Sequence, residues 1–496
     1  MFLVGGSVEA ALDALLQERT ARLLLRSLGL AAAVTVSAIL IALPAAWITA
    51  RSDIAGRRLW AVALALPLVI PSYIGAYAYI AALGPRGMLQ GSLGSSLGIE
   101  RLPDITGFFG AWLVLTLFTY PLVMLPVRAM LLRSDPSLEE AARSMGRGPR
   151  NIFMTITVPQ AAPAIGAGAL LVSLYVLSDF GAVSIMQFNS FTLDIHTAYG
   201  ASFDRTGAAS LALLLVGVMV AILWAESRFQ RRRSHYRSGP GVARRAEALG
   251  LGRWRAPALL FCGSVVTAAL LLPLVVLIRW TFSAVGGGTE SPAVFEAAVN
   301  SLTIAGAAAI ACTVSAVPIS YLLVRHRGSL AVAIERLSFT GYALPGIVVA
   351  LSLVFFGTRL VPALYQTEVM LVFAFVVLFV PMAITVIRSS LAQVSPRLNE
   401  AARSLGRSPI SSFGTVTLPL IRMGIVSALA LVCLTALKEL PATLILSPIG
   451  FSTLATEVWQ SSRVAFFERG AVPALILIGA SVGPLYLLLA RDRWSR

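Results

Sequence analysis

The sequence predicts an all-α protein, a polytopic membrane helix bundle made of two parallel, pseudo-symmetric repeats. Three observations support this prediction: the composition, the spacing of apolar segments and an internal similarity. Of the 496 residues, 57% are hydrophobic and only 12% are charged. A soluble protein of this length could not bury so much apolar surface in one core, whereas lipid can cover it in a membrane protein.

Apolar stretches long enough to cross a hydrocarbon layer of roughly 30 Å form two series along the chain. We expect about 11 membrane-spanning helices, or 12 if another precedes them. The ranges are 22–50, 60–83, 107–131, 160–186, 208–225, 257–280, 299–323, 338–357, 369–390, 421–446 and 471–490. Prolines inside these ranges do not argue against helices, because a bundle tolerates kinks.

The basic residues indicate the orientation. A set of alternate loops holds 27 of the 39 Lys and Arg residues, namely 51–59, 132–159, 226–256, 324–337, 388–422 and 491–496. The positive-inside rule puts this set in the cytoplasm, and we therefore expect a multi-pass protein of a bacterial inner membrane. The net charge of +16 is then a topology signal. It favours membrane lipid, and not nucleic acid, as the partner of the basic side chains.

A polar block occurs twice in the chain. Residues 138–149, LEEAARSMGRGP, match residues 398–409, LNEAARSLGRSP, at an offset of 260. The same offset relates Asp179 to Glu439. We therefore predict a first repeat over 1–227, a basic cytoplasmic linker over 228–256 and a second repeat over 257–496.

Other pairs of residues show how the offset changes upstream of this block. It is 274 between Arg51 and Arg325, and 278 between Pro67 and Pro345. The drop from 278 to 260 predicts about eighteen extra residues in the loop 84–106 of the first copy.

Both copies of the polar block lie on the predicted cytoplasmic side, so the repeats are parallel. Five crossings in each repeat then require one extra span, 257–280, before the second copy begins. The first copy has no equivalent before residue 22. Its N-terminus is expected on the periplasmic side, unless the natural chain starts further upstream.

The repeated block also has the residues of a docking helix. Each copy should form a short helix after Pro136 or Pro396, with small alanines that another protein can approach closely. A glycine can end such a helix at positive φ, and a glutamate near its start favours the positive end of its dipole. The residues concerned are Glu140, Ala141, Ala142, Gly146 and Pro159 in the first copy, and Glu400, Ala401, Ala402, Gly406 and Pro419 in the second.

These blocks, over 138–159 and 398–419, resemble the EAA loop of ABC importer permeases, the inner-membrane components of binding-protein-dependent transport. The resemblance implies that each short helix docks into a cleft of an ATP-binding cassette ATPase. It further implies an ATPase dimer on the cytoplasmic side and a periplasmic substrate-binding protein on the other.

The chain itself should not hydrolyse ATP. Its one lysine, Lys438, does not stand in a P-loop motif, which needs Gly-x-x-x-x-Gly-Lys-Ser/Thr so that the lysine reaches the phosphates. We therefore expect this chain not to be an enzyme and to hold no cofactor, with ATP bound by the partner subunit. His196, His235 and His326 are widely separated and show no metal-ligand spacing.

The fused length and residues 437–459 resemble the ferric-iron branch of these importers, which implies import of ferric iron from periplasm to cytoplasm. A permease for another small solute, such as thiamine or polyamine, stays open. An ion-coupled secondary transporter is an alternative from another class, but it needs coupling acids at the midplane and the centres of these spans hold almost none.

Asp179 and Glu439 are pseudo-equivalent acids near the outer ends of their predicted spans. One hypothesis is that they line the mouth of the substrate pathway, where carboxylate oxygens would suit a ferric ion. The alternative is that they sit at the membrane interface, where a charge reaches water at little cost.

Overall fold

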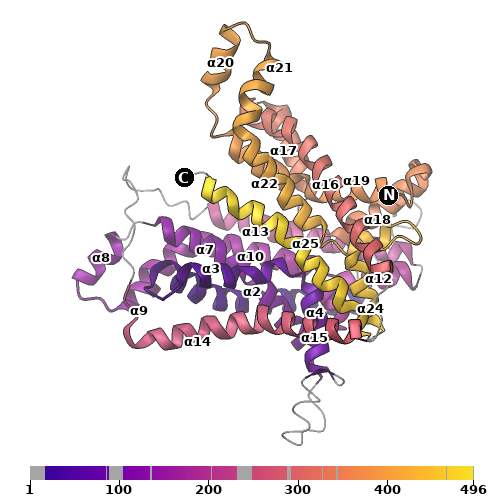
Figure 1. Cartoon of the computed structure of the whole chain (residues 1–496), viewed down its shortest axis with the longest axis horizontal. Helices are drawn as coiled ribbons and strands as arrows, with labels where there is room; N and C mark the ends of the chain where they lie inside the picture. Colours follow the sequence, from indigo (N-terminus) through magenta and orange to yellow (C-terminus); the bar gives the residue numbers. More distant parts are fainter. Residues whose placement is uncertain are drawn as a thin grey trace, which may run out of the picture. The chain divides into compact units, whose positions relative to one another are not determined.

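The computed structural model describes residues 17–84, 87–88, 104–134, 137–202, 204–231, 249–286, 292–326, 328–341, 344–464 and 466–494. Within these residues nearly all regular structure is helical, and the one β pairing is an isolated bridge between Ser52 and Leu249 (Figure 1). The all-α prediction is confirmed. Most of the predicted linker 228–256, most of the loop 84–106 and Pro136 lie outside the described residues.

The chain divides into two compact units, and the boundary in the sequence lies between Arg279 and Trp280. The first unit contains α2 (Glu18–Arg51), α3 (Arg57–Ala65), η2 (Leu66–Val69), α4 (Ser72–Leu83), α6 (Phe108–Thr119), α7 (Pro121–Arg133), α8 (Ser137–Ser144), α9 (Pro149–Ile152), η3 (Phe153–Thr157), α10 (Val158–Ser178), α11 (Gly181–Ile185), α12 (Phe191–Gly200), α13 (Arg205–Arg231), η4 (Gly252–Trp254), α14 (Arg255–Val266) and η5 (Thr267–Leu271). The boundary falls inside α15 (Leu272–Gly286).

The second unit contains α16 (Pro292–Arg325), α17 (Ser329–Thr340), α18 (Gly346–Leu360), η7 (Pro362–Leu364), α19 (Glu368–Leu391), α20 (Pro396–Ser404), α21 (Pro409–Ser412), η8 (Phe413–Thr417), α22 (Leu418–Ala436), α23 (Pro441–Leu446), α24 (Leu454–Arg463) and α25 (Phe467–Trp494). It repeats the order of α-helices from α2 to α13, with the single helix α19 in place of α6 and α7. The labels η3, η5 and η8 denote π-helical turns, and η2, η4 and η7 denote 3₁₀ turns.

Both units have the same core of three helices. In the first unit α2 packs along α7 and α10, and α7 packs on α10; in the second, α16 packs along α19 and α22, and α19 packs on α22. The three pairs α2/α16, α7/α19 and α10/α22 follow the offsets of 274 and 260 found in the sequence. The internal repeat is therefore also a repeat of packing.

Eight helices in the described residues are long and apolar enough to cross a membrane, or nine if one bent pair counts as a single span. The ranges predicted at 60–83 and 338–357 are each broken into two helices, and the second arm of the latter, α18, has 15 residues. The range 471–490 lies within α25, which is not among the eight. A polytopic bundle is confirmed, whereas the number of eleven spans is not reached in this part of the chain.

Prolines cause the breaks. Arg57–Val69 and Ser72–Leu83 meet at an angle of 94°, and Pro71 is the residue before the second arm. A proline disfavours helical geometry at the residue before it, and Ile70 is accordingly extended, with ψ 121°. Pro345 occupies the same position before α18, with φ and ψ within a few degrees of those of Pro71.

This geometry corrects one detail of the predicted repeat. The partner of Pro345 is Pro71, and not Pro67, so the offset stays at 274 up to this point. The first copy then carries 14 extra residues, the difference between 274 and 260, and not eighteen.

The span predicted at 257–280 as the start of the second repeat packs largely within the first unit. Its helix α14 contacts α3, and η5 contacts α6 and η2. The Tyr79 hydroxyl donates to the carbonyl of Ala268, 2.9 Å away, inside the π-helical turn. This hydrogen bond ties α4 to the span. The domain boundaries drawn from the repeat stay a prediction, because a repeat and a packing unit need not coincide.

A pair of glycines on α10 tests the packing of the first unit. A Cβ added to Gly168 would lie 2.6 Å from Val123 Cα on α7, whereas one added to Gly166 would meet only Glu226 Oε1 at 3.9 Å. We expect Gly168→Ala to lower the free energy of unfolding by about 1–3 kcal/mol, because the backbone of α7 must move. Gly166→Ala is the matched control and should be neutral or slightly stabilising. Thermal unfolding in detergent measures both, and equal behaviour of the two variants would contradict the packing of α10 on α7.

Candidate functional site

The two short helices of the repeated block end in the same way. In α8, the Gly146 N–H donates to Arg143 O and the Arg147 N–H donates to Ala142 O. Gly146 has φ +80° and Gly406, at the end of α20, has φ +84°. This paired hydrogen bonding around a left-handed residue is the Schellman motif, which favours glycine. The predicted role of both glycines as helix ends at positive φ is confirmed.

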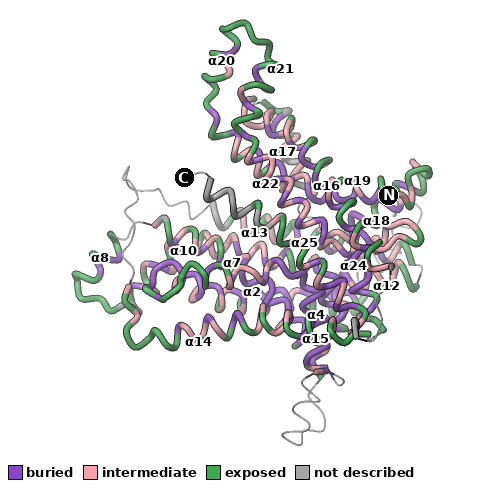
Figure 2. The backbone as a smooth tube through the Cα atoms, in the orientation of Figure 1, coloured by how far each residue is buried: buried purple, intermediate pink, exposed green. Residues whose placement is uncertain are grey.

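One side of each short helix faces solvent. Ala142 and Ala402 are buried, whereas Glu140 and Glu400 are exposed. Figure 2 shows that both α8 and α20 have exposed positions. Large apolar side chains are exposed as well: Leu138, Met145, Leu398, Leu405 and Ile410. Leu405 and Ile410 are 84% and 86% exposed. Apolar side chains gathered on a polar helical loop indicate a surface that another protein covers. In Figure 1, α20 and α21 extend beyond the other helices of their unit.

The residue before Glu140 fixes α8 to the membrane helices. Glu139 is buried and accepts a hydrogen bond from Thr157 Oγ1 at 3.1 Å, at the end of η3. Its carboxylate also lies 3.8 Å from the guanidinium of Arg51, the last residue of α2. Arg51 in turn donates to Ser134 Oγ, just after α7. The start of η3–α10 and the end of α2 therefore meet the short helix at one carboxylate, and the end of α7 joins them through Arg51.

The second unit builds a similar junction with an amide in place of the carboxylate. Asn399, at the position of Glu139, accepts from Thr417 Oγ1 and from Ser412 Oγ, each at 3.0 Å. Arg325, at the position of Arg51, donates to the carbonyl of Val394 at 3.1 Å. No motif in the sequence singles out the Glu139/Asn399 and Thr157/Thr417 pairs, although both pairs stand at the offset of 260.

A π-helical turn follows each short helix. It spans Phe153–Thr157 in the first unit and Phe413–Thr417 in the second, and Pro159 or Pro419 comes two residues later. Each proline lacks the N–H that would bond four residues back, and its ring needs room there. The wide turn supplies that room. Pro159 and Pro419 therefore lie in the first turn of α10 and α22, the helices that follow the loops.

Asp179 lies at a break in the helix and not inside it. The range 160–186 was predicted as one span, but α10 ends at Ser178 and α11 begins at Gly181. One carboxylate oxygen of Asp179 accepts from the backbone N–H groups of Ala182 and Val183, and the other accepts from Ser72 Oγ. The side chain thus caps α11 and holds the first residue of α4.

Glu439 makes the equivalent arrangement in the second unit. The helix predicted over 421–446 breaks in the same way, with α22 ending at Ala436 and α23 beginning at Pro441. Glu439 Oε1 accepts from the Ala442 N–H at 3.2 Å. It also lies against Gly346, the first residue of α18, where a Cβ would collide with it. Asp with Ser in one unit and Glu with Gly in the other fill the same space.

Among the described residues, no three His, Cys, Asp or Glu side chains gather as metal ligands would. Asp179 and Glu439 are the acids on which a metal pathway was predicted, and their observed contacts are with their own unit. The pathway role of both acids stays a prediction.

The sequence matches the family described as the binding-protein-dependent transport system inner membrane component over residues 34–235 and 316–491. The chain belongs to this family. The first matched range holds α8 and the second holds α20, so one polypeptide carries two copies of the family's unit. As a family member, it is a multi-pass transport component of the inner membrane.

Three relatives show how far the similarity extends. The Fe(3+)-transport system permease protein FbpB 2 of Haemophilus influenzae is 34% identical over 484 residues, which cover 96% of this chain and 91% of the relative. The thiamine transport system permease protein ThiP of Escherichia coli is 22% identical over 84% of this chain and 78% of its own length. The molybdenum transport system permease protein ModB of Escherichia coli is 31% identical, over 38% of this chain and 85% of its own.

The buried junction at α8 can be tested by substituting the adjacent residues Glu139 and Glu140 in turn. We expect Glu139→Ala to lower the free energy of unfolding by about 1–3 kcal/mol, because the buried Thr157 hydroxyl loses its acceptor and the buried Arg51 loses its carboxylate partner. Glu139→Gln should lose less, since it keeps an oxygen where the second unit has Asn399. Glu140→Ala is the control and should not change stability. Thermal unfolding in detergent measures all three, and an effect of Glu140→Ala as large as that of Glu139→Ala would contradict this assignment.

The acids at the helix breaks can be tested by giving the second unit the residue pair of the first. Gly346→Ser adds a Cβ and an Oγ against the Glu439 carboxylate and should weaken the cap of α23, which costs about 1 kcal/mol. Gly346→Ser combined with Glu439→Asp recreates the pair of the first unit and should recover stability. A double-mutant cycle on thermal unfolding gives the coupling energy. Additive losses would show that the two residues do not share one space.

Proposed function

We propose that the chain is the permease subunit of an ATP-driven importer that moves ferric iron from the periplasm to the cytoplasm. The assignment of the substrate rests on the similarity to a ferric-iron permease over 96% of the chain and 91% of that relative. The thiamine relative is less identical, and the molybdenum relative corresponds to one copy of the unit only. Thiamine is therefore the alternative substrate to test.

The proposed partners follow from the two faces of the molecule. An ATPase dimer would bind α8 and α20, one protomer to each short helix. The exposed apolar residues Met145 and Leu405 beside the terminating glycines support this docking. A periplasmic binding protein would deliver the ion on the opposite side, and the chain itself would bind no ATP and no cofactor.

The contacts within each unit suggest how docking would move the spans. A push on α8 would reach α10 through Thr157 and α2 through Arg51, because both meet Glu139 in a buried place. In the second unit, Asn399 would pass the same push to α22 through Thr417. ATP-driven closure of the ATPase dimer would then open the permease to the outside, and hydrolysis would reset it.

The two acids at the helix breaks need a separate experiment. Ferric coordination requires a negative oxygen, whereas capping an N–H requires only an acceptor. The double variant Asp179→Asn with Glu439→Gln keeps the acceptors and removes both charges. Uptake that falls at least about tenfold, with unchanged thermal stability, would support the pathway role; retained uptake would leave these acids as helix caps.

Uptake of radiolabelled ferric iron tests the proposed function in cells that lack this gene. The wild-type chain should restore uptake. Gly146→Val with Gly406→Val should not, because a β-branched residue at positive φ is strained and would distort both docking helices. Gly148→Val is the matched control, since Gly148 lies in open space without positive φ, and it should restore uptake.

The outcomes distinguish a wrong substrate assignment from a wrong role for the short helices. Restoration of thiamine uptake, without iron uptake, would replace the substrate and leave the importer intact. Full uptake by the Gly146 and Gly406 double variant would contradict the role of the short helices. Co-purification of the ATPase with wild type, but not with this variant, would locate the defect at docking.

A further inference from the structure

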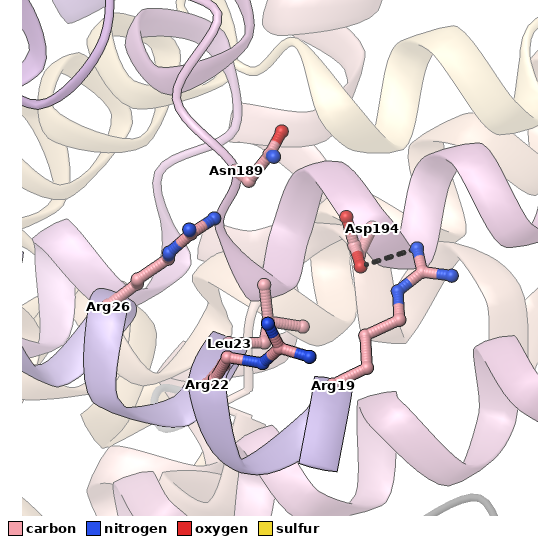
Figure 3. Close-up of a pocket in the computed structure, with 6 residues that line it drawn as sticks. All are labelled: Arg19, Arg22, Leu23, Arg26, Asn189 and Asp194. Carbon is pink, nitrogen blue, oxygen red and sulfur yellow. Dashed lines mark hydrogen bonds and ion pairs between the residues drawn. The ribbon is translucent and has the colours of Figure 1, made fainter. Parts of the chain in front are cut away.

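A basic cavity lies at the beginning of α2. Arg19, Arg22 and Arg26 line it from one side, and Asn189 and Asp194 line it from the loop before α12 and from α12 itself (Figure 3). The cavity has a volume of about 220 Å³. Arg19 donates to Asp194 at 3.1 Å. The wall therefore holds three guanidinium groups and one carboxylate.

The cavity lies at the outer end of the first unit. Arg51, at the far end of the 34-residue helix α2, meets the short helix α8, which marks the cytoplasmic end. A helix of this length spans about 50 Å, so Arg19 and Arg26 lie near the opposite side. The positive-inside rule disfavours three arginines there. Membrane topology therefore does not account for them.

The fold does not need these arginines either. Ser27 Oγ accepts from the Phe191 N–H, and Ser301 Oγ accepts from the Leu454 N–H, so both units dock the first core helix in the same way. At the offset of 274, the second unit has Ala293, Glu296 and Asn300 in place of the three arginines. There Asn300 donates to the carbonyl of Ser452 at 3.0 Å. The same helix start is thus built without a basic cavity.

The arginines remain accessible in the described contacts. The side chains of Arg19 and Arg22 are 77% and 64% exposed, and Arg26 is exposed as well. Arg22 lies 3.6 Å from Glu18, an exposed pair of the kind that contributes little. The three residues cover two helical turns, about 10 Å, which is wider than one small anion. Guanidinium groups spread in this way suit several carboxylates on a protein surface.

We propose that this basic cavity, formed by Arg19, Arg22 and Arg26, is a docking site for acidic side chains of the periplasmic binding protein. The inference rests on the proposed function. It deepens that function because charge would direct one lobe of the binding protein to the first unit. Since the second unit lacks the arginines, the binding protein would dock in a single orientation.

The test uses the full chain with its ATPase subunits in lipid nanodiscs. Binding of the iron-loaded periplasmic protein is followed by biolayer interferometry at 50 and 300 mM NaCl. Arg22→Glu with Arg26→Glu should lower the association rate at low salt at least about tenfold and reduce its salt dependence. Arg19 is left intact because it holds Asp194. Arg22→Lys with Arg26→Lys keeps the charge and should stay within about threefold of wild type. Arg359→Glu, the same change at another exposed arginine predicted outside, should have little effect.

The remaining outcomes overturn the proposal in distinguishable ways. Binding that the Glu variant leaves unchanged at both salt concentrations would exclude the cavity as a docking site. If the variant instead loses thermal stabilisation by phosphatidylglycerol, with unchanged binding kinetics, the ligand is a lipid phosphate. If it loses stabilisation by inorganic phosphate, the ligand is a small anion. Failure of the wild-type permease to bind the loaded protein would contradict the proposed importer itself.

Discussion

The arrangement of this protein depends on the junction where each of the short helices α8 and α20 is held to the membrane helices. Helices of eight and nine residues have little stability of their own, so their direction comes from tertiary contacts. The side-chain oxygen of Glu139 or Asn399, which accepts from Thr157 or Thr417, supplies that contact. It leaves the opposite face, with its exposed apolar residues, free for a partner. The same junction connects that face to the starts of α10 and α22.

A second constraint comes from breaking helices, because the first N–H groups of the helix after a break have no partner within that helix. The chain breaks after α10 and after α22, and in both places a carboxylate accepts the free N–H groups of the next short helix. The two units meet this need with different side chains. Asp179 reaches Ser72, and Glu439 fills the same space against Gly346. Such compensation indicates that the break itself is a requirement of the fold.

Comparison of the two units separates what the fold needs from what is special to one half. The terminating glycines, the π-helical turns, the serines that dock α2 and α16, and the capping acids occur in both. The buried charge at Glu139 and the basic cavity at the start of α2 occur in the first unit alone among these paired positions. A single chain with two copies can assign different partners to its halves in this way.

The sequence by itself determined the helical class, the two repeats and the glycines with positive φ, because these follow from composition, internal similarity and local backbone chemistry. Tertiary structure alone decided where the spans predicted at 60–83 and 160–186 break, and that Pro71 pairs with Pro345. It also decided that Glu139 is buried while its neighbour Glu140 is exposed, and that the span 257–280 packs largely within the first unit. These features depend on which surfaces meet across long distances in sequence. Apolarity and spacing within one segment do not indicate which distant segment it packs against.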